Sequence, residues 1–213
     1  MKHKNRNFNQ EASSWDENPG RAKLADDVVL AIRREITFTK SMDVLDYGCG
    51  TGLITLRIQS FVNTVTGIDS SEGMLNVLND KISRQKLTNV FTRHLDMEAG
   101  EDLHERFHLI VSSMTLHHIQ QPEILIKQLS KNLHVGGYLC IADLDPDDGL
   151  FHGDNQGVFH HGFERSHVRD MFEKAELQNI RDATAARVIK DLEVEEGGGG
   201  AREFTVFLVS CQK

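Results

Sequence analysis

The feature that most constrains the fold is a glycine-rich stretch at residues 44–52, Val-Leu-Asp-Tyr-Gly-Cys-Gly-Thr-Gly. Two apolar residues that favour a strand lead into Asp46 and then into three glycines at alternate positions. A helical pattern follows, with Ile54, Ile58 and Phe61 on one face. Strand, glycine-rich turn and helix together build nucleotide pockets in α/β folds, because glycine accepts unusual backbone angles and lets a ligand approach the main chain. The stretch therefore predicts an α/β fold with a ligand site at this turn.

Two classes of cofactor fit the turn. A dinucleotide-binding turn follows the pattern G-x-G-x-x-G, and Leu53 stands where its third glycine would fall. The stretch from Asp46 to Gly52 instead closely resembles motif I of the class I S-adenosylmethionine-dependent methyltransferases, an acid followed by G-x-G-x-G. The resemblance implies S-adenosylmethionine as cofactor and S-adenosylhomocysteine as product. The alternatives are a nicotinamide-dependent oxidoreductase on a Rossmann fold and a non-catalytic, methyltransferase-like binding protein, since a fold does not guarantee its chemistry.

The order of segments along the chain also predicts an α/β protein, because strand-like runs alternate with amphipathic helical patterns. The resemblance implies a Rossmann-like, doubly wound sheet of seven strands, mostly parallel with a C-terminal antiparallel strand. We expect one such domain over residues 21–213. Its last two strands are predicted at residues 186–189 and 204–209, joined by a surface connection that includes the glycines at 197–200.

The N-terminal segment, residues 1–20, is polar and is interrupted by Pro19. Such a segment is expected to be flexible. Related methyltransferases often use an N-terminal segment as a lid over the cofactor. In that interpretation Trp15 and Asp16 are the candidate lid residues.

A second acid occupies a position that suits the ribose of a cofactor. Residues 64–69 form a predicted strand that ends in Asp69, and the spacing from Gly48 is close to the ~20 residues at which these folds place a ribose-binding carboxylate. A carboxylate can accept hydrogen bonds from both vicinal hydroxyls. The competing interpretation is that Asp69 only caps the helix that begins near Ser70 or Ser71. Behind motif I, we favour the ribose role.

The resemblance implies further cofactor contacts by position. The expected set comprises Asp46, Gly48, Cys49, Gly50 and Gly52 around the methionine part, Ser70 and Met74 at the adenosine, Asp96 and Met97 at the adenine, and Ser112, Ser113 and His117 near the sulfonium. Two members have simpler explanations. Cys49 is interpreted as a small side chain in a tight turn, and Asp96 could be a solvated acid in an acidic loop.

No motif identifies the methyl acceptor. Transfer from a sulfonium is an in-line displacement that depends on positioning, and it needs a base only when the acceptor loses a proton. His117, His160 and His161 are the candidates for such a base because the pKa of histidine suits neutral pH; the catalytic residue itself stays open. His152 and Asp154, with His160 and His161, are of metal-binding types. They have no regular ligand spacing, so no metal site is expected.

Composition narrows the partners. The net charge of −8 argues against nucleic acid, and residues 112–115 (Ser-Ser-Met-Thr) lack the N-P-P-Y pattern of methyltransferases that act on nucleic-acid amino groups. Apolar runs are far shorter than the ~20 residues of a membrane helix. Three widely spaced cysteines form no disulfide framework. We therefore expect a cytoplasmic enzyme that acts on a small-molecule acceptor.

Overall fold

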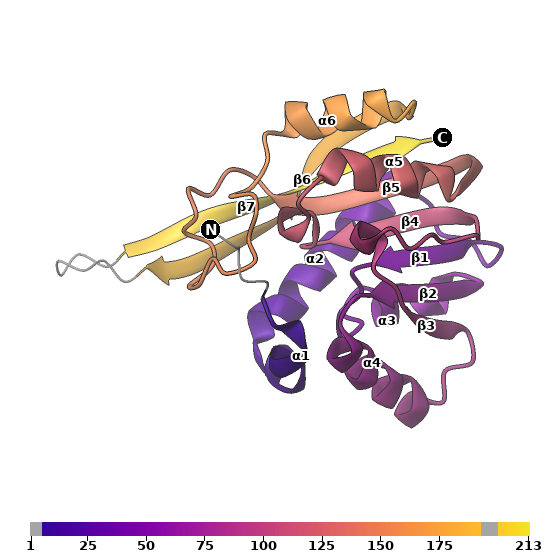
Figure 1. Ribbon diagram of the computed structural model, residues 1–213, viewed down its shortest axis with the longest axis horizontal. Coiled ribbons are helices and arrows are strands. Elements are labelled where there is room, and N and C mark those ends of the chain that lie inside the picture. Colours follow the sequence, from indigo (N-terminus) through magenta and orange to yellow (C-terminus); the bar gives the residue numbers. More distant parts are fainter. Residues whose placement is uncertain (1–5, 193–199) are drawn as a thin grey trace.

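The computed structural model describes residues 6–192 and 200–213, which form a seven-stranded sheet flanked by helices (Figure 1). The strand order is β3-β2-β1-β4-β5-β7-β6. The strands are β1 Asp43–Tyr47, β2 Thr64–Asp69, β3 Val90–His94, β4 Phe107–Ser113, β5 Leu133–Leu144, β6 Gln178–Leu192 and β7 Gly200–Gln212. Among these strands of the described chain, β7 alone runs against its neighbours: it is antiparallel to both β5 and β6. The predicted doubly wound sheet with a reversed C-terminal strand is confirmed.

The helices connect and cover these strands. The α-helices are α1 Phe8–Glu11, α2 Pro19–Glu35, α3 Thr55–Ile58, α4 Glu72–Gln85, α5 Pro122–Lys131 and α6 Arg165–Lys174; the 3₁₀ helices are η1 Ala12–Glu17, η2 Gln59–Phe61, η3 Met97–Ala99 and η4 Leu116–His118. Local sequence explains several of their boundaries. Asn18 caps α2 by accepting the N–H of Gly20 at 2.9 Å, and Pro19 occupies the first helical position, where no N–H is needed.

The core has one layer on each face of the sheet. Val44 and Leu45 are both fully buried and point to opposite faces. Leu45 packs in a cluster with residues of α5 and α6, such as Phe172. Val44 packs in a second cluster with residues of α2 and α3, such as Ile32. A strand that is covered on both faces reads as a continuous apolar run, as β4 does.

The helix after the glycine-rich turn differs from the prediction. The sequence predicts a single helical face through Ile54, Ile58 and Phe61, but α3 ends at Ile58 and the chain continues as the short 3₁₀ helix η2. Ile54 and Ile58 are buried, whereas Phe61 is 38% exposed. The chain must reach β2 at Thr64, so the helix stops before a third turn can bury Phe61.

The C-terminal strands are longer than predicted, because β6 and β7 pair as a two-stranded arm as far as Leu192 and Gly200 (Figure 1). Gly197, Gly198 and Gly199, predicted to lie in the surface connection, are outside the described residues.

Strand order determines where a ligand can bind. From β1 the chain moves outward through β2 and β3, then returns to place β4 and β5 on the other side of β1. Ligands in open α/β sheets bind beside such a reversal, at the carboxyl ends of the strands. In the described part of the chain, none of the helices combines the length and apolar character needed to cross a bilayer.

Candidate functional site

A cavity of about 300 Å³ lies at the carboxyl ends of β1, β2 and β4, where the strand order reverses. Nine of the thirteen predicted cofactor residues line it: Asp46, Gly48, Cys49, Gly50, Asp69, Ser70, Met74, Asp96 and Ser113. The other four, Gly52, Met97, Ser112 and His117, are not lining residues. The motif I turn, the predicted ribose acid and the end of β4 therefore share one space.

The three motif I glycines all have positive φ, at 69° for Gly48, 52° for Gly50 and 84° for Gly52. Their surroundings differ. A Cβ at Gly52 would lie 2.3 Å from the Leu78 Cδ1 of α4, so this glycine lets the helix pack against the turn. A Cβ at Gly50 would have only Met74 Sδ within reach, at 4.0 Å. Gly50 therefore leaves the backbone open toward the cavity.

This difference predicts two separable effects. Gly52→Ala adds a clash with Leu78 to the strain of positive φ and should destabilise the fold by about 2–4 kcal/mol. Gly50→Ala carries only the strain, about 1 kcal/mol, but its methyl group should weaken S-adenosylhomocysteine binding by about tenfold or more. Denaturant unfolding and calorimetric titration of both variants measure the two effects. Equal losses of stability in both variants would contradict this division of roles.

Asp69 links the motif I turn to the next helix. Its Oδ2 accepts the N–H of Gly50 at 2.8 Å, and its Oδ1 accepts the N–H of Ser71 at 2.8 Å. Ser71, not Asp69, caps α4, because its hydroxyl accepts the N–H of Met74 at 3.2 Å. Burial raises the pKa of Asp69, and the backbone donors oppose that rise. The carboxylate is thus held in place at the cavity wall, as the predicted ribose contact requires.

Asp46 is 1% exposed at the base of the cavity. The Thr55 hydroxyl of α3 donates to its Oδ2 at 2.5 Å. Burial raises the pKa of Asp46 to about 7, and the Thr55 hydrogen bond opposes the rise. Burial likewise raises the pKa of the Cys49 thiol. That shift keeps Cys49 as a thiol, in agreement with its interpretation as a small packing residue.

Asp96, the predicted adenine contact, has a structural role and also lies in the cavity wall. The Asp96 side chain accepts the N–H groups of Glu98 and Ala99, at 3.0 and 3.1 Å, and so begins η3. It also lines the cavity. Met97 is 1% exposed and packs in the core beneath. Ser112 is buried, and its hydroxyl has no hydrogen-bond partner among the described residues.

The N-terminal segment lies over the motif I turn. The Thr51 hydroxyl donates to Asp16 at 2.7 Å, and Asp16 pairs with Lys81 of α4 at 2.5 Å. Phe8 and Trp15 contribute aromatic rings to the cavity wall. Asp16 itself does not line the cavity. These contacts place the segment where a lid would lie; that role stays a prediction.

The three histidines predicted as candidate bases do not line the cavity. His117 is buried, and its Nδ1–H donates to Asp143 at 2.7 Å. The Nε2 of His160 is hydrogen-bonded to the carbonyl of Ile119 at 3.0 Å, and His161 is exposed. None of these three base candidates lines the cavity, whereas His118 does.

Several lining residues are not singled out by the sequence. They include Arg6, Phe8, Arg21, Glu98 and Thr115. Arg21 and Phe8 belong to α2 and the N-terminal segment, which reach the cavity only through tertiary packing. The sequence gives one indication of this packing: arginines occur near Trp15, and arginine stacks readily on aromatic rings.

Comparison with known proteins identifies the class. Residues 38–189 match the family described as a methyltransferase domain. The chain belongs to this family. Membership in it argues against the nicotinamide-dependent alternative.

Similar proteins agree with this assignment. The chain is 32% identical over 153 residues to an uncharacterised methyltransferase of Schizosaccharomyces pombe, covering 65% of this chain and 54% of the relative. It is 30% identical over 142 residues to the ubiquinone biosynthesis O-methyltransferase of Coxiella burnetii, covering 65% and 60%. The chain thus spans little more than half the length of these relatives. The crystal structure of YcgJ from Bacillus subtilis has the same fold, with a TM-score of 0.74 at 14% identity over 88% of this chain and 98% of that one.

Proposed function

We propose that this chain transfers the methyl group of S-adenosylmethionine to an oxygen atom of a small, largely apolar or aromatic acceptor. The observation that carries the proposal is that the motif I turn and Asp69 share one cavity with the aromatic rings of Phe8, Trp15 and Phe159. One part of this cavity suits the cofactor, and the other suits an acceptor of modest size. The similarity to an O-methyltransferase supports oxygen as the acceptor atom.

Charges in the cavity suit the cofactor. Asp46, Asp69 and Asp96 line the side formed by the sheet, and Arg6 and Arg21 line the side formed by the N-terminal segment and α2. S-adenosylmethionine carries a sulfonium and an ammonium that carboxylates favour, together with one carboxylate that an arginine can bind. The acids would hold the cationic groups, and an arginine would hold the carboxylate.

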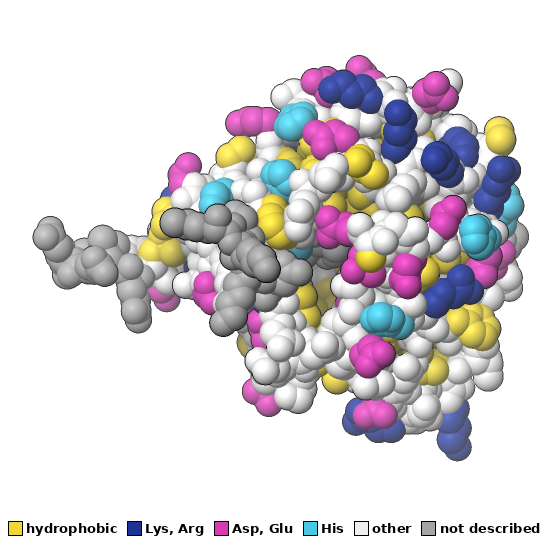
Figure 2. Space-filling view, in the orientation of Figure 1, with side chains coloured by type: hydrophobic (Ala, Val, Ile, Leu, Met, Phe, Trp, Pro, Cys, Tyr) yellow, Lys and Arg dark blue, Asp and Glu magenta, His cyan; other side chains and the backbone are white. Residues whose placement is uncertain are grey.

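One face of the molecule agrees with a small-molecule partner. On the face shown in Figure 2, Asp and Glu side chains lie among the Lys and Arg side chains. A nucleic-acid site would need a continuous basic stripe. The cavity, rather than this surface, supplies the recognition chemistry in the proposal.

The reaction would be an in-line displacement at the methyl carbon. The acceptor oxygen attacks the methyl group, the carbon–sulfur bond breaks, its electron pair stays on sulfur, and S-adenosylhomocysteine leaves. A hydroxyl acceptor must lose its proton. His118 is the histidine in the cavity wall, but burial and then the neighbouring His117 lower its pKa to about 4. Such a neutral imidazole accepts a hydrogen bond well but is a weak base.

The proposal is tested by binding and turnover measured on the same preparation. S-adenosylhomocysteine should bind with one site per chain. Methyl transfer from labelled S-adenosylmethionine should occur to members of a panel of phenols and catechols, and not to the matched anilines. Turnover restricted to amines would overturn oxygen as the acceptor atom. Cofactor binding without turnover on the whole panel would support the non-catalytic alternative.

Arg21 offers a sharper prediction about the cofactor. Its guanidinium lies 3.7 Å from the centre of the Trp15 ring and donates to the Trp15 carbonyl at 2.8 Å, and in the described chain it forms no ion pair with a carboxylate. Arg21→Met should weaken S-adenosylhomocysteine binding by about 10- to 100-fold. Binding of 5′-methylthioadenosine, which has no carboxylate, should not change. Both affinities are measured by calorimetry.

Arg33→Met is the matched control, because Arg33 lies on the same helix and stacks on Phe61 at 4.3 Å, outside the cavity. It should leave both affinities unaltered. If Arg21→Met leaves S-adenosylhomocysteine binding intact, Arg21 does not hold the cofactor carboxylate.

A further inference from the structure

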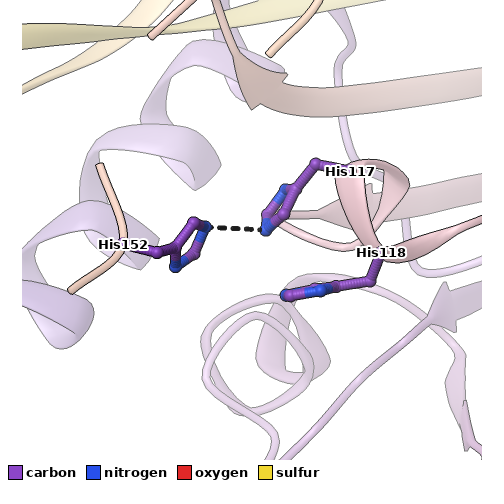
Figure 3. A group of neighbouring side chains, drawn as sticks. All are labelled: His117, His118 and His152. Atoms are coloured by element: carbon purple, nitrogen blue, oxygen red, sulfur yellow. Dashed lines mark hydrogen bonds between the residues drawn. The ribbon is translucent and has the colours of Figure 1, made fainter. Parts of the chain in front are cut away.

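Three histidines from two separate segments converge beside the cofactor cavity (Figure 3). His117 and His118 belong to η4, and His152 belongs to the loop between β5 and α6. Each offers a ring nitrogen, and these nitrogens all lie within 4.8 Å of one another. His117 is buried, and the other two are partly buried. The set differs from the one considered in the sequence, where His152 is grouped with Asp154, His160 and His161.

Hydrogen bonds orient two of the three rings. The Nδ1 of His117 donates to the buried carboxylate of Asp143 at 2.7 Å, and the Nδ1 of His118 donates to the carbonyl of Gly157 at 2.7 Å. Metal-binding histidines almost always donate their second nitrogen to a carboxylate or a carbonyl in this way. The Nε2 atoms of His117 and His118 are left to bind an ion.

The spacing of the closest pair suits a tetrahedral ion. Bonds of about 2.0–2.1 Å at tetrahedral angles place two ligand nitrogens about 3.3–3.4 Å apart. The Nε2 atoms of His117 and His152 are 3.2 Å apart (Figure 3). With its Nδ1–H donated to Asp143, a neutral His117 ring would present a lone pair on Nε2, and the Nε2–H of His152 would be the donor between the two rings. An ion would take the place of that proton, and a modest rotation of His118 would complete three ligands.

Charge at the cluster also favours an ion. The buried carboxylate of Asp143 lies 2.7 Å from the Nδ1 of His117 and places a negative charge beside the cluster. Two cations oppose an added charge. Arg6 is paired with Glu11 at 2.7 Å, and Lys190 donates to the Phe151 carbonyl at 2.6 Å. Asp143 contributes the compensating negative charge.

We propose that His117, His118 and His152 bind a divalent transition-metal ion of the zinc class, with its fourth coordination position open toward the cavity. Three histidine nitrogens and an open position are a donor set typical of catalytic rather than structural zinc. Imidazole ligands without thiolate or clustered carboxylate favour Zn²⁺ and neighbouring ions over Mg²⁺ or Ca²⁺. His118 lines the cavity, so an ion on its Nε2 would be close to a bound acceptor.

The consequence for the reaction rests on the proposed function. An acceptor hydroxyl bound at the open position would lose its proton more readily, because a bound zinc ion lowers the pKa of a coordinated oxygen ligand. This would supply the activation that His118 alone does not. Ion binding itself does not depend on that role.

The experiment is a titration of metal-free, full-length protein with Zn²⁺ in competition with a chelating dye, repeated with Co²⁺ to read coordination from its visible absorption. One ion per chain and a four-coordinate cobalt spectrum are expected. His152→Gln and His118→Gln should each weaken Zn²⁺ binding by about 100-fold or more. His161→Gln is the matched control from the same loop, and it should bind Zn²⁺ as the parent protein does.

Cofactor binding and methyl transfer, measured on the same variants, distinguish loss of the metal site from loss of the fold and from loss of activity. S-adenosylhomocysteine binding shows that the His152→Gln variant is folded, since His152 does not line the cofactor cavity. Failure of the parent protein to bind Zn²⁺, or equal binding by the parent protein and both ligand variants, would overturn the metal site even if the cofactor binds normally. Stoichiometric binding that both ligand variants lose would support the site even if no acceptor turns over, and only the role in methyl transfer would then fall.

Discussion

Asp69→Ala is expected to weaken S-adenosylhomocysteine binding by about 100-fold or more, the largest loss of cofactor affinity that we predict for a single substitution. Hydrogen bonds to a charged group contribute about 1.5–3 kcal/mol each, and a ribose offers two hydroxyls to this carboxylate. Asp69 already accepts the N–H groups of Gly50 and Ser71, at 2.8 Å each. It is therefore positioned before the cofactor arrives, so little ordering opposes its contribution. Titration calorimetry of parent and variant measures the change.

The control must separate recognition of the ribose from support of the motif I turn, because Asp69→Ala removes both. Titration with the 2′-deoxy analogue of S-adenosylhomocysteine completes a double-mutant cycle. If Asp69 holds the ribose, the analogue should bind the parent protein weakly and lose much less affinity on mutation than the natural ligand does. Asp69→Asn, which retains one backbone acceptor, should fall between parent and alanine. Equal losses for both ligands would assign Asp69 to loop support alone.

The motif I turn and the buried parallel strands could be predicted, because local sequence determines them. The strand–turn–helix signal at residues 44–52 identified the class, and apolar runs such as β4 marked the buried parallel strands. β6 was underestimated because much of it is exposed, with alternating and mostly polar side chains, so it has no apolar run. The outer part of β6 is held mainly by its pairing with β7. A short window of sequence does not reveal that pairing.

More of the predicted residues line the cavity on the side of motif I than on the side of the aromatic and histidine residues, for a physical reason. Motif I and Asp69 lie at the ends of adjacent parallel strands, so their meeting follows from the fold. The aromatic and histidine side of the cavity depends on loops and the N-terminal segment. Phe8 reaches the His118 ring, with a centroid distance of 5.1 Å, and His152 reaches His117 across 35 residues. Such contacts depend on how a loop folds back over the sheet, and the spacing of residues along the chain does not predict this.

Asp46→Asn should remove the pH dependence of cofactor binding and stabilise the free protein above neutral pH. Burial raises the pKa of Asp46 to about 7 in the folded chain, against an ordinary value of 3.8. The folded state therefore holds this proton more tightly than the unfolded state does. The resulting stabilisation is complete below the unfolded pKa and is lost as pH rises through about 7. A shift of about three pKa units corresponds to roughly 4 kcal/mol, and we expect about 2–4 kcal/mol between pH 5 and pH 8.

Cofactor binding should show the opposite trend. The ammonium of S-adenosylmethionine would pair with ionised Asp46, so affinity should rise with pH up to about 7 and then level off. Below that pH, binding should release a proton, which calorimetry detects as an enthalpy that depends on the buffer. The asparagine amide of the Asp46→Asn variant cannot ionise, so this variant should bind S-adenosylhomocysteine with a weaker affinity that hardly changes between about pH 5.5 and 8.

The stability of the free protein and its affinity for the cofactor should change with pH in opposite directions. A carboxyl that is buried without a cation destabilises the empty protein when it ionises, and the ammonium of a bound ligand would offset that cost. Thr55, the hydroxyl donor to Asp46 at 2.5 Å, can donate equally to the amide oxygen of the introduced asparagine, so the variant should fold. Denaturant unfolding of parent and variant at pH 5 and pH 8, beside titrations at the same values, measures both effects. If the variant is no more stable than the parent at pH 8, or if its affinity follows pH as the parent's does, Asp46 is not the group that meets the ammonium.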